Sequence, residues 1–193
     1  MKIAIVKYNA GNLQSVIYAL QRLGIEPMVT NQAEELRSAD KVIFPGVGEA
    51  ASAMKSLKEN NLDTLLPTLK QPFLGICLGL QLMCKHSEER DTPCLGVFDL
   101  QVKKFKPKMK VPHMGWNRLE NMKSPLFNQL NGNAYVYFVH SYYAEMGKGT
   151  IATADYINPF SAALQKDNFF AIQAHPEKSG EVGARIIRNF LDL

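Results

Sequence analysis

The stretch Pro72-Phe-Leu-Gly-Ile-Cys-Leu-Gly-Leu-Gln-Leu82 decides the fold of this chain. Its apolar first half predicts a buried strand over residues 73–76, and residues 78–85 predict the start of a helix. A strand that runs directly into a helix leaves room only for a tight turn, on which Cys77 lies between two glycines. We interpret G-x-C-x-G as the cysteine counterpart of the nucleophile elbow, because such a turn exposes the sulfur at a helix N-terminus. The alternative is a structural cysteine at the buried end of a strand.

The segments around this turn predict an α/β fold. Before it, strands are predicted at 3–6, 27–30 and 41–44, and helices or helical turns at 13–23, 34–39, 49–59 and 63–69. After residue 87 the helical periodicity disappears, and strands are predicted at 100–105, 134–139, 151–156, 162–165 and 169–173, followed by a last amphipathic helix. We therefore predict one domain over residues 1–193, with a mostly parallel central sheet flanked by helices and a more antiparallel C-terminal half.

Composition narrows the class of protein. At 193 residues, with 46% hydrophobic residues, the chain can form one globular domain with a sizeable core. No apolar run is long enough for a transmembrane helix, and residues 1–7 are interpreted as a first strand rather than a signal peptide. The net charge of +4 is too mild to indicate nucleic acid. The three cysteines, without a CxxC pair, predict neither a disulfide framework nor a metal site, which fits a reducing cytoplasmic compartment.

A nucleophilic cysteine needs a base. The candidates are His86, His113, His140 and His175. His86 lies in a charged stretch and is interpreted as a solvated surface residue. His175 follows an apolar strand and precedes Pro176, which favours an extended backbone at the histidine. Since residues two apart in an extended chain point the same way, Glu177 is expected to hold one ring nitrogen and leave the other for the thiol. An incidental His and Glu in a loop after a strand is the alternative.

Acyl transfer also needs donors for a developing oxyanion. The backbone N–H of Leu78, directly after the cysteine, is one predicted donor. The segment Pro45-Gly-Val-Gly48 follows a buried strand, and its glycines allow backbone N–H groups to face a ligand. We predict the second donor there, with an ordinary strand-to-helix turn as the alternative.

These motifs together resemble a known family. Pro-Gly-Val-Gly, Gly-Ile-Cys-Leu-Gly-Leu-Gln and His-Pro-Glu are similar to the class I (triad-type) glutamine amidotransferases. The resemblance narrows to the glutaminase subunits of imidazole glycerol phosphate synthases of histidine biosynthesis through four blocks: Tyr8-Asn-Ala-Gly-Asn-Leu-Gln-Ser-Val16, Val111-Pro-His-Met-Gly-Trp-Asn117, Tyr137-Phe-Val-His-Ser-Tyr142 and Gln173-Ala-His-Pro-Glu-Lys-Ser-Gly180. Two residues depart from the family pattern: Ala174 replaces a bulky aromatic, which is expected to loosen packing behind the histidine, and Leu80 replaces a common methionine.

The resemblance implies a reaction and a set of roles. Cys77 would attack the side-chain amide of glutamine, His175 would accept the thiol proton and protonate the leaving ammonia, and Glu177 would orient His175. Hydrolysis of the resulting thioester would release glutamate, with no cofactor or metal. The oxyanion loop would comprise Gly46, Val47 and Gly48, with the N–H of Leu78. The substrate would be held by Gly46, Gln81, Ser141 and Tyr142.

The resemblance also implies a partner. Ammonia is mostly protonated in neutral water and then no longer nucleophilic, so family members dock as a heterodimer on a (β/α)₈-barrel cyclase and pass ammonia through its interior. That cyclase makes imidazole glycerol phosphate and AICAR. The positions expected at this interface are Asn12, Trp116, Tyr137 and Lys178. Trp116 is predicted in a polar loop, which favours an interface anchor over core packing, and Lys178 could equally be an ordinary surface lysine.

Other interpretations remain open from the sequence. The chain could be the glutaminase subunit of another synthase, of the anthranilate, aminodeoxychorismate or guanylate type, although these are not expected to carry the Pro112–Asn117 block. It could also be a catalytically silent regulatory subunit or an unrelated cysteine hydrolase or peptidase. The basic run Lys103–Lys110 could attract an acidic partner or a phosphate, but a solvated hairpin or an edge strand protected by lysines is the favoured interpretation. No aromatic ladder accompanies it, so nucleic acid is not expected.

Overall fold

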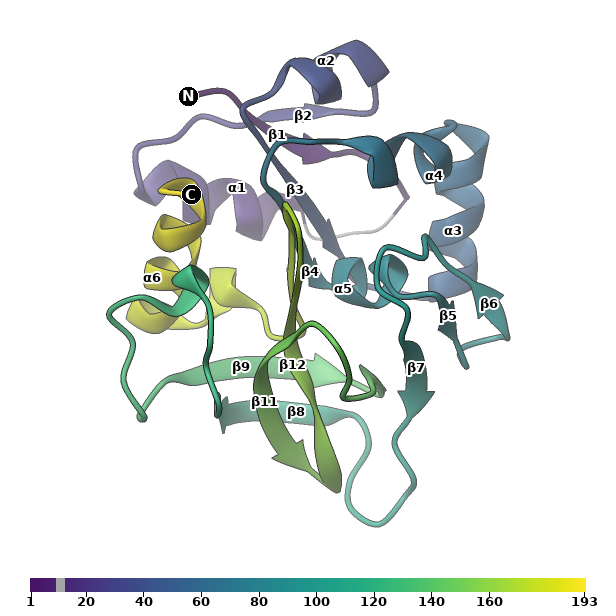
Figure 1. Cartoon of the computed structure of the whole chain (residues 1–193), viewed down its shortest axis with the longest axis vertical. Helices are drawn as coiled ribbons and strands as arrows, with labels where there is room; N and C mark the ends of the chain where they lie inside the picture. The colour runs from purple at the N-terminus through teal and green to yellow at the C-terminus, as the bar shows by residue number, and fades with distance from the viewer. Residues whose placement is uncertain (10–12) are drawn as a thin grey trace.

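The computed structural model describes residues 1–9 and 13–193 (Figure 1). Asn12, one of the residues predicted at a partner interface, lies outside the described residues. The central sheet has seven strands in the order β11-β12-β13-β4-β3-β1-β2. Their bounds are β1 Ile3–Val6, β2 Met28–Thr30, β3 Lys41–Gly46, β4 Phe73–Cys77, β11 Thr150–Tyr156, β12 Asn158–Lys166 and β13 Phe169–Ile172.

Strand direction divides this sheet into two parts. The strands β2, β1, β3, β4 and β13 run parallel, whereas β12 pairs antiparallel with both β13 and β11. The predicted fold class is therefore confirmed: the sheet is mostly parallel, and the antiparallel pairs belong to the C-terminal half. Parallel strands in the middle of a sheet are buried on both faces, which is why their sequences are almost continuously apolar.

Helices cover the two faces of the sheet. The helices α1 Leu13–Arg22 and α6 Gly180–Leu191 lie on one side, and α3 Ala50–Glu59, α4 Leu62–Leu65 and α5 Leu78–Met83 lie on the other (Figure 1). The shorter α2 Ala33–Ser38 follows β2, and η1 Leu66–Thr68 follows α4. Strand side chains alternate between two core clusters, as Phe44 and Phe73 face the α3 side while Ile43 and Leu74 face the α1 side. Among the described residues no helix combines the length and apolar character that crossing a bilayer requires.

The second half adds two smaller sheets. One has four strands in the order β10-β7-β5-β6, with bounds β5 His86–Ser87, β6 Thr92–Pro93, β7 Gln101–Lys104 and β10 Tyr142–Ala144. The other, called the ribbon below, pairs β8 His113–Arg118 with β9 Tyr135–His140. Short helical turns occur at η2 Pro125–Phe127 and η3 Pro176–Lys178.

The ribbon corrects one prediction. Trp116 was expected in a polar loop, but it lies in β8, opposite Tyr137 of β9. The β8 sequence HMGWNR gives no clear signal for a strand because it holds a glycine and several polar residues. Pairing with the strongly apolar β9 supplies the missing stabilisation, and that pairing joins segments far apart in the chain.

The basic run divides between a strand and a turn. Lys103 and Lys104 end β7, and the Lys103 ammonium pairs with Glu145 at 2.6 Å. Residues 105–110 lie beyond the end of that strand. The strand β7 lies between β5 and β10, so the interpretation of these lysines as an edge strand was wrong, whereas residues 106–110 are exposed to solvent as expected.

Candidate active site

The predicted tight turn between β4 and α5 is present. The strand ends on Cys77, one residue later than predicted, and the helix begins at Leu78. Cys77 has φ 54° and ψ −106°, a conformation that side-chain-bearing residues seldom adopt. Such a strained strand-to-helix turn is the geometry of a nucleophile elbow.

The flanking glycines are required by the neighbouring strand as well as by the turn itself. A Cβ on Gly79 would overlap the carbonyl oxygen of Phe44 in β3. A Cβ on Gly75 would lie 2.5 Å from Met83 Sδ. The Phe44 oxygen belongs to the backbone and cannot move aside, so α5 can approach β3 this closely only with glycine at position 79. A Cβ on Gly75 would also lie 3.0 Å from the Gly79 backbone, which makes that position tight as well.

The loop after β3 is held over the turn. Gly46 pairs with Cys77 in the β3–β4 register, and a Cβ there would overlap the hydroxyl of Tyr8. That hydroxyl donates to the Pro45 carbonyl at 2.8 Å, and burial raises the pKa of Tyr8 well above its usual range. The buried tyrosine therefore remains a neutral donor that positions the backbone before Val47.

His175 and Glu177 form a buried pair. Nδ1 of His175 lies 2.8 Å from Oε1 of Glu177, and each side chain is only 2% exposed. The contact is as predicted, but the expected route to it was wrong. Residues 176–178 form the helical turn η3 rather than an extended segment, because Pro176 also suits the first position of a helical turn. Ser179 closes the turn by donating to the His175 carbonyl at 2.6 Å.

The ring of His175 lies near enough to Cys77 for the charge of the sulfur to change the pKa of the ring. Its Nε2 atom has no hydrogen-bond partner of ordinary geometry among the described residues. Burial lowers the pKa of His175, but the negative charges of a Cys77 thiolate and of the Glu177 carboxylate outweigh this effect and raise the pKa to about 10. The ring is therefore an imidazolium at neutral pH when the sulfur is a thiolate, which is a charge pair suited to nucleophilic catalysis.

Gln173 is a residue of this site that sequence reasoning did not single out. Its Nε2 donates to Cys77 Sγ at 3.7 Å, and its Oε1 accepts from Gln81 Nε2 at 3.1 Å. Gln81 Nε2 also donates to the Tyr142 carbonyl at 2.9 Å. The sequence placed Gln173 at the end of a predicted strand, and in the structure it directly follows β13. Only the β13–β4 pairing brings it beside the cysteine.

A pocket of about 330 Å³ opens beside the cysteine. Of the predicted site residues, it is lined by Val47, Gly48, Cys77, Leu78, Gln81, Ser141 and Tyr142. It is also lined by residues that were not predicted: Glu89, Pro112, Val139 and His140. The Glu89 carboxylate accepts from the Ala50 backbone N–H at 2.7 Å, so its position is fixed at the pocket wall. Glu89 lies in the same charged stretch as His86 and was not singled out from the sequence.

His86, in the same stretch, is half-buried and lies 2.8 Å from Asp91 through its Nε2. It therefore lies at the surface as predicted, but it is partly covered and paired with Asp91 rather than fully solvated. The contact closes the turn between β5 and β6, which carries Glu89 toward the pocket.

Comparison with known proteins agrees with this geometry. The family model described as "Glutamine amidotransferase class-I" matches residues 4–193. The chain belongs to the class I glutamine amidotransferase family. It is 59% identical over its whole length to the full "Imidazole glycerol phosphate synthase subunit HisH" of Bacteroides fragilis, and 47% identical to the subunit of that name from Pectobacterium atrosepticum, again with both chains fully covered.

Solved structures share the fold of this amidotransferase at much lower identity. A structure described as a glutamine amidotransferase superposes with a TM-score of 0.78 at 21% identity, covering 100% of this chain and 98% of the other. The glutaminase domain of the Trypanosoma brucei protein CTPS superposes with a TM-score of 0.62 at 14% identity, covering 100% and 94%. The fold is therefore shared over the full length of this chain.

Three of the residues predicted at a partner interface of this amidotransferase lie close to one another. Trp116 is 59% exposed, which excludes the alternative of core packing, and its ring meets that of Tyr137 edge-on at 6.2 Å. Lys178 is exposed in η3, which is tied to β9 because the His175 N–H donates to the Tyr137 carbonyl at 2.9 Å. The ribbon is therefore joined to the histidine loop, by which we mean residues 175–179.

Ala174, which replaces a bulky family residue, is fully buried in the core on the α1 side of the sheet. Its predicted loosening of the packing behind His175 stays a prediction.

Proposed function

We propose that this amidotransferase is the glutaminase subunit of an imidazole glycerol phosphate synthase. The observation that carries the proposal is Cys77 on a strained elbow, beside a small pocket and near the buried His175–Glu177 pair. The full-length similarity to subunits of that synthase supports the assignment to histidine biosynthesis. A cytoplasmic location follows from the three free thiols and from that pathway.

The proposed chemistry has two stages. The Cys77 thiolate attacks the carbonyl carbon of the glutamine side-chain amide, and the resulting oxyanion accepts hydrogen bonds from the N–H groups of Leu78 and of the Val47–Gly48 loop. The imidazolium of His175 protonates the nitrogen, so that ammonia leaves and a γ-glutamyl thioester remains. His175 then takes a proton from water, which attacks the thioester and releases glutamate. Glu177 holds the ring in the orientation that both stages need.

The proposed pocket suits a free amino acid. A volume of about 330 Å³ is at the small end of ligand sites. We assign the amino-acid end of glutamine to Ser141 and Tyr142, with the Glu89 carboxylate as the counter-charge for its ammonium group. Gln81 also lines the pocket, whereas Gly46 does not line it and lies beside the nucleophilic cysteine through the β3–β4 pairing. A peptide substrate would have no ammonium group at that position, which disfavours a peptidase.

The proposed partner surface is the outer side of the ribbon. Alternation along β8 and β9 places several large side chains in solvent, namely Met114, Trp116 and Tyr135. Exposed aromatic and methionine side chains gathered on one element mark protein interfaces, in which tryptophan is a frequent anchor. We propose that a (β/α)₈-barrel cyclase binds there as a heterodimer, with Tyr137 and Lys178 at the same face, and receives the ammonia.

Glutamate release tests this proposal. We expect the purified chain to hydrolyse glutamine slowly alone and much faster with the cyclase barrel and its ribonucleotide substrate present. If glutamate appears but the barrel changes nothing, the glutaminase chemistry stands and the subunit belongs to another synthase. If neither condition yields glutamate, the chain is a silent regulatory subunit.

Trp116→Ala is expected to weaken binding to the cyclase about 100-fold, the usual effect of removing a central interface tryptophan. Isothermal titration of the barrel into the variant measures it. Met146→Ala is the matched control, because Met146 is 53% exposed but lies outside the ribbon. Equal affinities of the two variants for the cyclase would show that the ribbon is not part of the interface.

Glu177→Gln is expected to shift the alkaline limit of glutaminase activity to lower pH. The Glu177 carboxylate is one of the charges that raise the pKa of His175 to about 10, so its neutralisation lowers that pKa. Loss of one close opposite charge is worth about one pH unit or more. The pH dependence of kcat/KM for glutamine measures the shift. An unchanged alkaline limb would mean that His175 is not the group that titrates there.

A further inference from the structure

A chain of hydrogen bonds runs from the ribbon to the wall of the pocket. Asn117 Nδ2 lies 3.4 Å from His113 Nε2, and His113 Nδ1 lies 3.0 Å from His140 Nε2. His140 Nδ1 lies 2.7 Å from the Tyr142 carbonyl oxygen. Neither histidine takes part in the proposed reaction, although His140 lines the pocket.

Elementary hydrogen-bond chemistry sets the direction of every proton in this chain. The Tyr142 carbonyl can only accept, so Nδ1 of His140 carries a hydrogen. A neutral His140 ring then has a bare Nε2, which accepts from Nδ1 of His113. Nε2 of His113 is bare in turn and accepts from the Asn117 amide. One arrangement of protons therefore satisfies all four residues.

Burial keeps both rings neutral, as this arrangement requires. His113 is 4% exposed and His140 is 5% exposed. Burial lowers the pKa of His113 to about 4, and that of His140 to about 3. The His113 ring is stacked on Phe138 and Tyr156. The His140 ring meets Phe160 edge-on, with 5.2 Å between the ring centres, so both histidine rings have little freedom to reorient.

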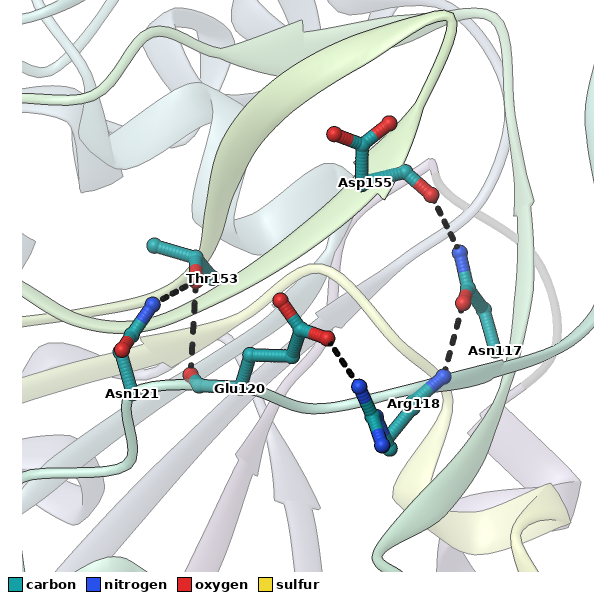
Figure 2. Close-up of polar contacts among 6 residues, drawn as sticks. All are labelled: Asn117, Arg118, Glu120, Asn121, Thr153 and Asp155. Atoms are coloured by element: carbon teal, nitrogen blue, oxygen red, sulfur yellow. Dashed lines mark hydrogen bonds and ion pairs between the residues drawn. The ribbon is translucent and has the colours of Figure 1, made fainter. Parts of the chain in front are cut away.

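Asn117, the first residue of this hydrogen-bond chain, is itself fixed in one orientation. Asn117 Nδ2 donates to the Asp155 carbonyl of β11 at 2.9 Å, and its Oδ1 accepts from the Arg118 N–H at 2.8 Å (Figure 2). The amide therefore cannot rotate to present its oxygen to His113. Figure 2 also shows a second link between the segment after β8 and β11, in which the Thr153 hydroxyl accepts from Asn121 and donates to the Glu120 carbonyl. That link makes no contact with the histidines.

At the Tyr142 carbonyl, the hydrogen bonds of the two histidines join the hydrogen bonds that reach Cys77. The Tyr142 carbonyl accepts from both His140 Nδ1 and Gln81 Nε2. Gln81 in turn holds Gln173, whose amide donates to Cys77 Sγ. The Tyr142 carbonyl thus accepts hydrogen bonds from two sides. One set of bonds leads through His140 to the ribbon, and the other leads through Gln81 and Gln173 to the Cys77 sulfur.

We propose that His140, fixed as its neutral Nδ1–H tautomer by His113 and Asn117, is a positioning residue for the glutaminase reaction. Its hydrogen bond sets the Tyr142 carbonyl, which orients Gln81 and, through Gln173, the Cys77 sulfur. This inference rests on the proposed function for its kinetic consequence. The hydrogen-bond arrangement and the reactivity of Cys77 can be measured without that function.

The first test is spectroscopic and uses the unmodified chain. Long-range ¹H–¹⁵N NMR of the histidine rings at neutral pH distinguishes the two tautomers and the charged ring. We expect His140 and His113 both as Nδ1–H tautomers. An Nε2–H tautomer or a charged ring for His140 would overturn the proposal.

The second test compares two replacements of one side chain. Asparagine can place its amide nitrogen near the position of Nδ1, whereas glutamine reaches only the position of Nε2. We expect His140→Gln to lower both kcat/KM for glutamine and the rate of Cys77 alkylation by iodoacetamide about tenfold, as loss of a buried hydrogen bond does. His140→Asn should restore most of both rates. Alkylation is read at the Cys77 peptide by mass spectrometry.

A matched pair at the ribbon keeps the test decisive if His140→Gln does not fold. Asn117→Ala removes a link to β11 together with the contact to His113, and should slow Cys77 alkylation about threefold. Thr153→Val removes the hydroxyl contacts to Asn121 and to the Glu120 carbonyl, keeps the backbone pairing of Glu120 with Thr153, and should leave that rate unchanged. Equal rates for this pair, or for the two His140 variants, would overturn the proposal. Absence of Cys77-dependent glutamate from every variant, with the alkylation differences retained, would instead refute the proposed function alone.

Discussion

Cys77→Ala is expected to reduce glutamate release by roughly 10⁴-fold or more, because removing a covalent nucleophile removes the reaction path itself. The sulfur is the group that the strained turn places at the pocket wall and that Gln173 contacts. Glutamate formed per mole of chain, in the presence of the partner, measures the loss. The fold should be retained, since alanine removes one atom from a side chain at a pocket wall.

Cys94→Ala is the matched control for this result. Burial is the main reason that the pKa of the Cys94 thiol rises to about 12, so the sulfur is protonated at neutral pH and unreactive. Its variant should keep the full rate. Glutamate release that survives in Cys77→Ala, or that is lost in Cys94→Ala, would assign the nucleophile elsewhere.

Gly79→Ala is expected to lower the free energy of unfolding by about 3 kcal/mol or more, and to abolish activity with it. The added methyl group would overlap the Phe44 carbonyl oxygen, so either α5 or β3 must move. Backbone atoms of a central strand cannot give way as a flexible side chain can. Urea denaturation followed by circular dichroism measures the stability.

Gly132→Ala tests whether the cost belongs to the close approach or to glycine replacement in general. A Cβ at Gly132 would meet no atom within 4 Å. Its variant should stay within about 0.5 kcal/mol of the parent chain, as surface substitutions do. Similar stabilities for the two variants would show that α5 can move away from the sheet without loss.

The elbow shows how far local pattern reaches. An apolar run, a cysteine between glycines and a helix-forming segment lie next to one another in the chain, so their arrangement depends on neighbouring residues alone. The strand, the turn and the helix were therefore predictable to within about a residue at the turn. The alternation of strands and helices before it predicted the parallel sheet for the same reason.

The histidine loop shows where such reasoning stops. That His175 would meet Glu177 was predictable from their spacing, but the helical turn that brings them together was not. Proline tolerates both an extended segment and the first turn of a helix, so the local signal was ambiguous. The choice depends on Ser179 and on the backbone of Tyr137, which lies far away in the sequence.

By itself, the sequence determined the fold class, the nucleophile turn and the residues of the candidate triad, because each is encoded by burial pattern or by spacing along a short segment. The tertiary structure alone decided that Trp116 lies in a strand, that Glu89 reaches the pocket, and that Gln173 lies beside Cys77. It also decided that His113 and His140 form one oriented chain. These features depend on the register between strands distant in sequence, which hydrophobic pattern does not specify for a half-polar ribbon or for the residue just beyond a strand.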